Sequence, residues 1–264
     1  RYCSVKCQKD HRAKHKRECK KRAAELHDEI LFKQPESSHL GDCPICFLPL
    51  SLDVNKSSLS SCCCVLICNG CSHANHIKDK TSMRDPRCPF CRVPYVSSAA
   101  EAERNIMKRI KAGDRVAFRQ KGCQAREERN YSVAVDLLEK AAKMGDVEAH
   151  SQLSQLYCDG EGVEMDMKKA VHHFEEAAIG GNPLARFNLG VVSTRERKFN
   201  RAVKHFIIAA RQGHDGALEQ LKELYKKGTV TKAELAAALR AHQAAVDSTK
   251  SPQREAAARA PLAS

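Results

Sequence analysis

Closely spaced cysteine pairs dominate the first third of the chain. The sequence has 14 cysteines, and 12 of them lie within residues 1–91. With two residues between the members of a pair, one tight turn can direct both thiolates at one zinc ion about 2.3 Å away. This spacing favours zinc over disulfides, and therefore a reducing compartment. Three pairs have it: Cys43/Cys46, Cys68/Cys71 and Cys88/Cys91.

The run Cys62–Cys64 adds three further thiols between the first and second pairs. Together these residues provide eight or nine ligands for two tetrahedral Zn²⁺ ions. A structural site closed by four protein ligands leaves no position for a water molecule, so we expect no hydrolytic chemistry. From the spacing alone, the partner of Cys62 is either Cys63 or Cys64. His73 and His76 lie near enough along the chain to replace a cysteine.

This segment resembles an all-cysteine RING-type zinc finger across residues 43–91. In that family the first and third ligand pairs share one zinc, and the second and fourth pairs share the other. Cys63 is preferred to Cys64 because similar RING fingers leave four residues before the next ligand. The resemblance therefore implies two interleaved sites, one formed by Cys43, Cys46, Cys68 and Cys71 and one formed by Cys62, Cys63, Cys88 and Cys91.

The resemblance also implies a surface for a ubiquitin-conjugating enzyme. Ile45, between the first two ligands, and Pro89, after the seventh, stand where the family places apolar contacts. Arg92 follows the last ligand, where ligases often carry an arginine that bridges the conjugating enzyme and its ubiquitin, a task suited to a planar guanidinium. The alternative interpretation, which does not use the resemblance, is that Ile45 and Pro89 are turn residues and Arg92 is a solvated charge. The absence of tryptophan weakens the expected groove.

Residues 1–33 carry a second, shorter ligand pattern. Cys3 and Cys7 are four residues apart, as are His15 and Cys19, so each pair can lie on one face of a helix. The pattern resembles the second half of a MYND-type zinc finger, a module that holds proline-rich peptides of other proteins. Two alternatives stay open: the four residues hold one more zinc together, or they hold none.

The chain is basic, with a formal net charge of +13. Between Arg12 and Arg22 there are seven lysines or arginines and one glutamate. Such a run can contact nucleic acid or an acidic partner by non-specific electrostatics. The preferred interpretation is a solvated helix face, since no base-reading motif accompanies the run.

From about residue 99 the cysteine pairs stop and a repeat of small apolar residues begins. Alanine or a large apolar residue recurs at i, i+4, i+7 and i+8, followed three residues later by glycine. The apolar positions form one helix stripe, and the glycine suits a left-handed end to the helix. The three copies are Ala134, Leu138, Ala141, Ala142 and Gly145; Ala170, Phe174, Ala177, Ala178 and Gly181; and Ala202, Phe206, Ala209, Ala210 and Gly213.

A second helix is expected before each of these, marked by alanines at 117, 149, 185 and 217 that are spaced 32, 36 and 32 residues apart. The extra four residues fall in the glycine-containing loop 159–163. Helix pairs of this kind bury their apolar faces by stacking into a solenoid. The alternative is a helical bundle with accidental spacing. The pattern resembles the Sel-like repeat, a relative of the tetratricopeptide repeat, and implies an adaptor for other proteins.

The expected organisation is therefore mainly α-helical: a small zinc-stabilised RING-type module followed by an α-solenoid of helix-pair repeats. We expect a half-MYND segment over 1–33, a linker over 34–42, the RING-type module over 43–92, repeats over 99–246 and a disordered tail over 247–264. No run of about 18 apolar residues predicts a membrane span. Thiol-rich zinc sites point to the cytoplasm or the nucleus.

Two functions fit these features. The first is a RING-type ubiquitin ligase, in which the RING recruits a ubiquitin-conjugating enzyme and the repeats recruit the protein substrate. No residue of this chain would then be catalytic, because the module acts by orienting the thioester. The second is a non-catalytic scaffold whose zinc fingers are purely structural and bind proteins or peptides. Nucleic acid is a distant third partner class.

Overall fold

The structure is a computed structural model that describes residues 12–96 and 98–260, with side chains from residue 18 onwards. The chain divides after Gln34 into two compact units. The first contains helix α2 (Arg12–Leu31), where exposed ion pairs such as Arg22 with Glu25, at 3.4 Å, link successive turns. All other described elements belong to the second unit.

A short hairpin and one helix form the cysteine-rich part of the second unit. The 3-10 helix η1 (Val54–Lys56) leads into antiparallel strands β1 (Ser57–Ser60) and β2 (Val65–Cys68). Helix α3 (Asn69–Thr81) follows β2 directly, because the Cys68 sulfur accepts a hydrogen bond from the backbone N–H of Cys71 at 3.4 Å and caps the helix. The hairpin turn and this helix start bring two groups of cysteines into position.

The apolar core of this part is small. Its buried residues are Cys43, Leu50, Ile67, Cys68 and Cys71, so three of the five are thiol residues. The two aromatic side chains of the segment do not enlarge it, since Phe47 is 76% exposed and Phe90 is 48% exposed. Leu50 and Ile67 are thus the only large aliphatic residues in that core.

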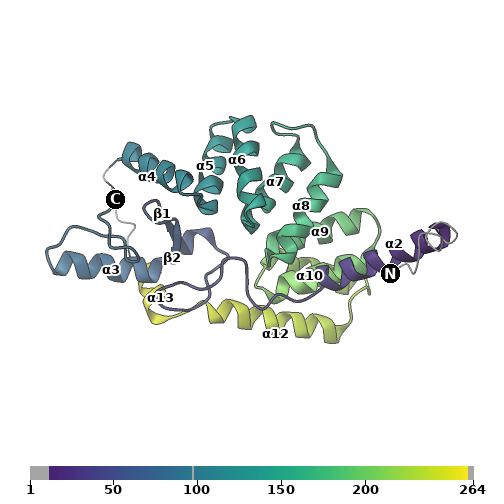
Figure 1. Cartoon of the computed structure of the whole chain (residues 1–264). Coiled ribbons are helices and arrows are strands. Elements are labelled where there is room, and N and C mark those ends of the chain that lie inside the picture. Colours follow the sequence, from purple (N-terminus) through teal and green to yellow (C-terminus); the bar gives the residue numbers. More distant parts are fainter. Residues whose placement is uncertain (1–11, 97, 261–264) are drawn as a thin grey trace. The chain divides into compact units, whose positions relative to one another are not determined.

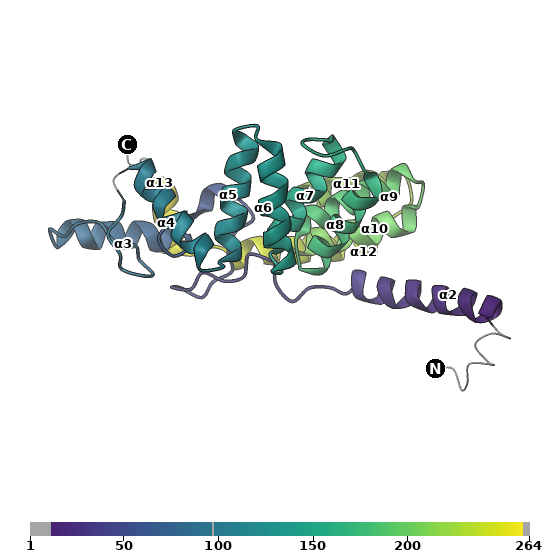
Figure 2. The ribbon, with the colours of Figure 1, turned by 45° about the horizontal axis from the view of Figure 1, so that its top comes forward.

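Helices α4 to α12 build the repeat region, and Figure 1 shows α5 to α10 following one another in chain order, with Figure 2 giving a second view. Each helix pair packs against the next, which is the arrangement of a solenoid. Helix α4 (Ala99–Lys111) precedes the pairs. The pairs are α5 (Arg115–Glu127) with α6 (Tyr131–Lys143), α7 (Val147–Asp159) with α8 (Met167–Ile179), α9 (Pro183–Arg195) with α10 (Phe199–Arg211), and α11 (Asp215–Lys226) with α12 (Lys232–Ser248).

The repeated sequence positions have the same structural role in every copy. All twelve apolar positions of the stripe are buried, and the alanine markers of the preceding helices are fully buried. Gly145, Gly181 and Gly213 have φ angles of +79°, +88° and +89°, so each ends its helix in the left-handed conformation. The residue after each glycine caps the next helix with its side chain. The predicted solenoid of helix pairs is confirmed.

The C-terminal segment differs from the prediction of a disordered tail over 247–264. Helix α12 continues to Ser248, and helix α13 (Pro252–Arg259) follows. Ser251 caps α13 through a hydrogen bond from the Arg254 N–H at 3.2 Å, and Pro252 occupies the first turn. The prediction overlooked this start signal, and it could not foresee that α13 packs against α3.

Candidate metal centre

One group of four cysteines lies around the start of helix α3. The sulfurs of Cys43, Cys46, Cys68 and Cys71 all lie within 4.8 Å of one another. The first two come from the loop before the hairpin, and the last two from the end of β2 and the first turn of α3. Cys46 Sγ and Cys68 Sγ are 3.8 Å apart. We call these residues the first quartet.

A second group joins the hairpin turn to the loop that follows α3. It consists of Cys62, Cys63, Cys88 and Cys91, again with all sulfurs within 4.8 Å of one another. Cys63 Sγ lies 3.9 Å from Cys88 Sγ, and Cys62 Sγ lies 3.3 Å from Cys91 Sγ. We call these residues the second quartet. Along the chain the two quartets alternate, because each takes every other ligand pair.

The sulfur spacing suits a tetrahedral zinc ion. Four sulfurs about 2.3 Å from one ion lie about 3.8 Å from each other. Even the 3.3 Å between the sulfurs of Cys62 and Cys91 is far longer than a disulfide bond of about 2.0 Å. All twelve cysteines in the described part of the chain are thiols. The residues therefore could hold two zinc ions, although the identity of the metal stays a prediction.

Two of the ligand pairs sit in backbone turns with the same geometry. In the first, Cys43 N donates to Leu48 O and Phe47 N donates to Cys43 O, at 3.0 and 2.8 Å. In the second, Cys88 N donates to Val93 O and Arg92 N donates to Cys88 O, at 2.8 and 2.9 Å. The residue after each pair, Phe47 or Arg92, has a positive φ of 55° or 63°. Each quartet thus receives one such knuckle.

The thiols of each quartet have unequal acidities. Burial opposes ionisation of Cys43, but backbone N–H donors, that of Cys46 first, outweigh it and lower its pKa to about 7. For Cys88, burial is likewise outweighed by the Cys91 N–H and the Ser60 hydroxyl, so its pKa also falls to about 7. Burial, together with the charge on Cys88, raises the pKa of Cys63 to about 12 despite a backbone donor. A dication would relieve this mutual repulsion of thiolates.

Cys64 lies outside both quartets. It is 6% exposed and packs with Ile106 and Ala117 of helices α4 and α5. Its φ of 54° turns the chain at the end of the cysteine run. Cys64 therefore anchors the hairpin to the first repeat helices, whereas Cys63 lies with the ligand sulfurs. His73 and His76 belong to neither quartet.

Substitution of the adjacent cysteines tests this assignment. We expect Cys63→Ser to reduce the zinc content of the purified protein from two equivalents to one. Cys64→Ser should retain two, because its side chain contacts apolar residues instead of ligand sulfurs. Native mass spectrometry of both variants measures the stoichiometry. Loss of a zinc from Cys64→Ser alone would reverse the assignment.

The predicted partner-binding residues lie near the two knuckles. Ile45 is 37% exposed within the first knuckle, and Pro89 is half-buried within the second. Ile77 of α3 and Phe90 are each 48% exposed. Apolar side chains are therefore available at the surface of the module, but their contact with another protein stays a prediction.

Arg92 has an internal role that the sequence did not reveal. Its Nη1 donates to Asn75 Oδ1 at 2.6 Å, and its Nη2 lies 3.5 Å from Oδ1 of Asp79. Asp79 is 1% exposed and also accepts from the backbone N–H of Arg87 at 3.2 Å. Arg92 thus ties helix α3 to the second knuckle, and its substitution would not be a clean test of partner binding. The sequence offered only the spacing of Asn75 and Asp79, four residues apart on α3, and spacing does not show that Asp79 is buried.

Three of the four N-terminal ligand candidates are beyond the described side chains. Cys3 and Cys7 lie outside the described residues, and the His15 side chain is also outside them. Cys19 is exposed on α2. Zinc binding by the half-MYND pattern therefore stays a prediction.

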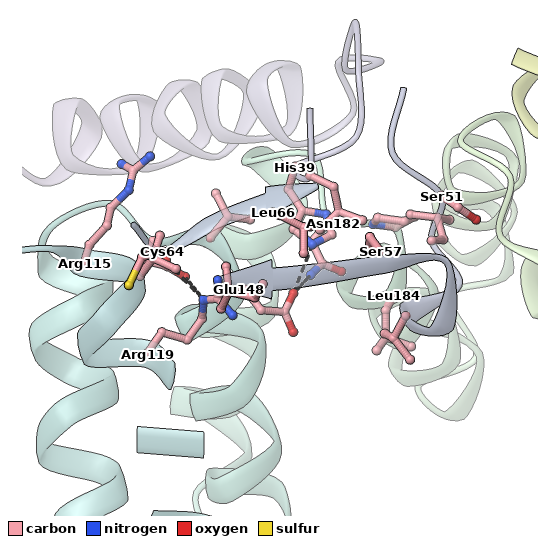
Figure 3. A pocket seen from close by; sticks show the side chains of 18 of the residues that line it. His39, Ser51, Ser57, Cys64, Leu66, Arg115, Arg119, Glu148, Asn182 and Leu184 are labelled. Carbon is pink, nitrogen blue, oxygen red and sulfur yellow. Dashed lines mark hydrogen bonds and ion pairs between the residues drawn. The ribbon is translucent and has the colours of Figure 1, made fainter. Parts of the chain in front are cut away.

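A cavity of about 650 Å³ separates the hairpin from the repeat helices (Figure 3). The linker residue His39 closes one side, where its Nε2 lies 3.0 Å from Oε2 of Glu148. Asn182 Nδ2 donates to the same oxygen at 2.9 Å. Burial opposes ionisation of Glu148, but the His39 bond helps to outweigh it and holds its pKa below the usual value. These contacts fix the linker against the solenoid.

The comparisons with known proteins concern the repeat region. Residues 125–146, 147–182 and 183–214 match the family described as Sel1 repeat. A Sel1 repeat protein of Oxalobacter formigenes has a similar structure, with a TM-score of 0.50 and 19% sequence identity over 67% of this chain and 71% of that one. The chain thus contains Sel1 repeats arranged as a solenoid.

Two curated relatives share part of this sequence. DAP3-binding cell death enhancer 1 of Rattus norvegicus is 34% identical over 96 residues, which are 35% of this chain and 18% of that protein. Chitin synthase regulatory factor 4 of Schizosaccharomyces pombe is 33% identical over 82 residues, which are 31% of this chain and 13% of that protein. The matches therefore span less than a fifth of either relative. In residues 12–96 and 98–260 no helix has the length and apolar character needed to cross a membrane.

Proposed function

We propose that this protein is a zinc-dependent RING-type ubiquitin ligase whose Sel1 repeats bind the protein to be modified. The observation that carries the proposal is the alternation of the two quartets along the chain. Because the quartets alternate, each ion would join two segments that are separated by a segment of the other site. This cross-braced arrangement is the one that the resemblance to a RING finger implies. In such a module the zinc ions are structural, because four thiolates leave no open coordination position.

The chain itself would then bind and orient the reacting molecules, and none of its own side chains would react. Ile45, half-exposed in the first knuckle, and Ile77 on α3 offer apolar contacts for a ubiquitin-conjugating enzyme. The enzyme's thioester would be attacked by a lysine of the protein substrate, and the acceleration would come from orientation. The dependence on reduced thiols favours the cytoplasm or the nucleus as the compartment of this activity.

The Sel1 repeats support the substrate-binding half of the proposal. Stacked helix pairs present an extended surface, and such surfaces bind other proteins. One relative's name describes binding to another protein, and the other's name describes a regulatory factor. The same features favour the second candidate, a non-catalytic scaffold in which the zinc module only binds peptides.

A discharge assay separates the two candidates. The wild-type protein should accelerate release of ubiquitin from at least one of a broad panel of charged conjugating enzymes. Ile45→Ala should reduce that rate by about tenfold or more, since truncation of a central interface residue typically costs about 2 kcal/mol. Both proteins should hold two zinc equivalents by native mass spectrometry.

Leu239→Ala is the matched control, because Leu239 is 40% exposed on α12 and lies outside the zinc module. We expect its discharge rate to equal that of the wild type. If no enzyme of the panel responds to the wild-type protein while the zinc content is two, the ligase proposal is wrong and the scaffold candidate replaces it.

A further inference from the structure

The C-terminal helix α13 docks onto the cysteine-rich module from the far end of the sequence. Figures 1 and 2 show α13 beside α3, and the two helices pack together. Gln253 Nε2 donates to Gly70 O at 3.1 Å. A Cβ atom on Gly70 would lie 2.9 Å from Cγ of Arg254 and 3.0 Å from its backbone, so the close approach requires glycine at position 70. The contact is therefore built into both segments.

Arg254 places its guanidinium against the first knuckle. Its Nη1 donates to Pro49 O at 2.6 Å, and its Nη2 donates to Leu48 O at 3.0 Å. Nη2 also lies 3.3 Å from the sulfur of Cys46, within hydrogen-bonding distance. A second bond from Nη1, to Thr249 O at 2.8 Å, orients the side chain from its own segment. The planar fork thus contacts the knuckle backbone and one ligand sulfur together.

The electrostatics of a tetrathiolate site explain why a cation belongs there. Four thiolates around Zn²⁺ carry a net charge of −2, which a neighbouring guanidinium partly offsets. A hydrogen bond to a metal-bound sulfur also holds that ligand in place. In the second quartet the comparable side-chain neighbour is the neutral Ser60 hydroxyl, 3.6 Å from Cys88 Sγ. The two quartets therefore differ in their surroundings although their ligands are alike.

We propose that Arg254 is a positioning residue for the first quartet: it donates a hydrogen bond to the Cys46 thiolate, so that metal retention by this quartet depends on the docked C-terminal helix. The second quartet has no such dependence. This inference rests on the proposed zinc content of the module. Metal binding by the first quartet, which includes Cys46, would thus depend on Arg254, 208 residues later in the chain.

Zinc release from the full-length protein tests the inference. A metallochromic chelator in excess should remove zinc from the wild type in two phases, one for each quartet. Arg254→Gln should accelerate one phase by about tenfold or more, the effect typical of losing a hydrogen bond to a metal ligand, and leave the other unchanged. Arg254→Lys should accelerate it less, because an ammonium keeps the charge but not the fork.

The matched control is Arg259→Gln, on the same helix, where the exposed side chain forms an ion pair with Glu255 at 3.6 Å. Its release rates should equal those of the wild type. Cobalt substitution gives a second readout: the sulfur-to-cobalt charge-transfer band of Arg254→Gln should move to lower energy, since the lost hydrogen bond no longer withdraws charge from sulfur. Cys63→Ser, which leaves only the first quartet, should show the accelerated phase when combined with Arg254→Gln.

Equal release rates and unchanged spectra for Arg254→Gln and the wild type would overturn the inference. So would acceleration of both phases together, which would indicate general loosening of the module. A wild-type protein that binds no zinc would instead contradict the proposed function, so the two failures can be told apart.

Discussion

Removal of zinc is expected to unfold the segment between Cys43 and Cys91 while the Sel1 repeats stay folded. The segment buries only two large aliphatic side chains, Leu50 and Ile67, in its core. Structural zinc contributes about 10–16 kcal/mol of folding free energy in small modules, so its loss exceeds what this core can offset. The repeats have their own cores, which contain no metal ligand.

Hydrogen exchange followed by mass spectrometry measures this difference. After chelation, amides of β1, β2 and α3 should exchange as in an unfolded chain, whereas those of α7 to α10 should keep their protection. Far-UV circular dichroism should change little, because most helical residues lie in the repeats. Addition of zinc under reducing conditions should restore protection.

A matched thiol control accompanies this experiment. Cys123 packs against a repeat core, distant in sequence from both quartets, so Cys123→Ser should bind two zincs and respond to chelation like the wild type. A metal-free protein that retained full protection over residues 57–81 would contradict the prediction. So would purified protein in which the quartet sulfurs are joined as disulfides.

Phe206→Ala is expected to destabilise the C-terminal repeats by about 3–5 kcal/mol, the usual cost of truncating a buried phenylalanine. Phe206 is 1% exposed and lies in the core formed by buried residues of α10, α11 and α12. Its ring packs against Phe187 with centroids 5.8 Å apart. It also fills the space over Gly190, where a Cβ atom would approach the ring to 2.5 Å. Truncation leaves a cavity that this close packing cannot fill.

Urea unfolding followed by circular dichroism gives the free-energy change, and Phe199→Ala is the control from the same helix. Phe199 is 44% exposed, so its truncation should cost less than about 1 kcal/mol. In a solenoid each repeat is stabilised by contacts with its neighbours. Amide hydrogen exchange in Phe206→Ala should therefore rise first in α9 to α12. Equal destabilisation by the two variants would show that Phe206 is not a core residue of this kind.

The repeat region was predictable because its signal is periodic. The stripe of alanines and large apolar residues matches the helical period, and each stripe ends in a glycine with a positive φ. Local chemistry therefore specified the helix pairs, and only stacking could bury their faces. The cysteine knuckles were equally readable, because two-residue spacing restricts the turn that joins two ligands.

The C-terminal helix was missed for a different reason. Ser251 and Pro252 form a helix-start signal, but the following alanines and charged residues have no apolar stripe to indicate burial. What holds α13 in place is polar: Gln253 on the Gly70 carbonyl, and Arg254 on the first knuckle. Contacts across more than 180 residues leave no local pattern in either segment.

The sequence by itself determined the helix pairs, the ligand types and the spacing of the knuckles, because each depends on residues that are neighbours along the chain. The spacing alone left Cys63 and Cys64 open, the resemblance preferred Cys63, and the tertiary structure brings the Cys63 sulfur to the other three of its quartet. Only the tertiary structure showed that Arg92 contacts Asp79 and that Arg254 reaches Cys46. These choices depend on which surfaces meet after folding. Packing of Cys64 against Ile106, for example, removes it from the quartet, and no spacing rule contains that contact.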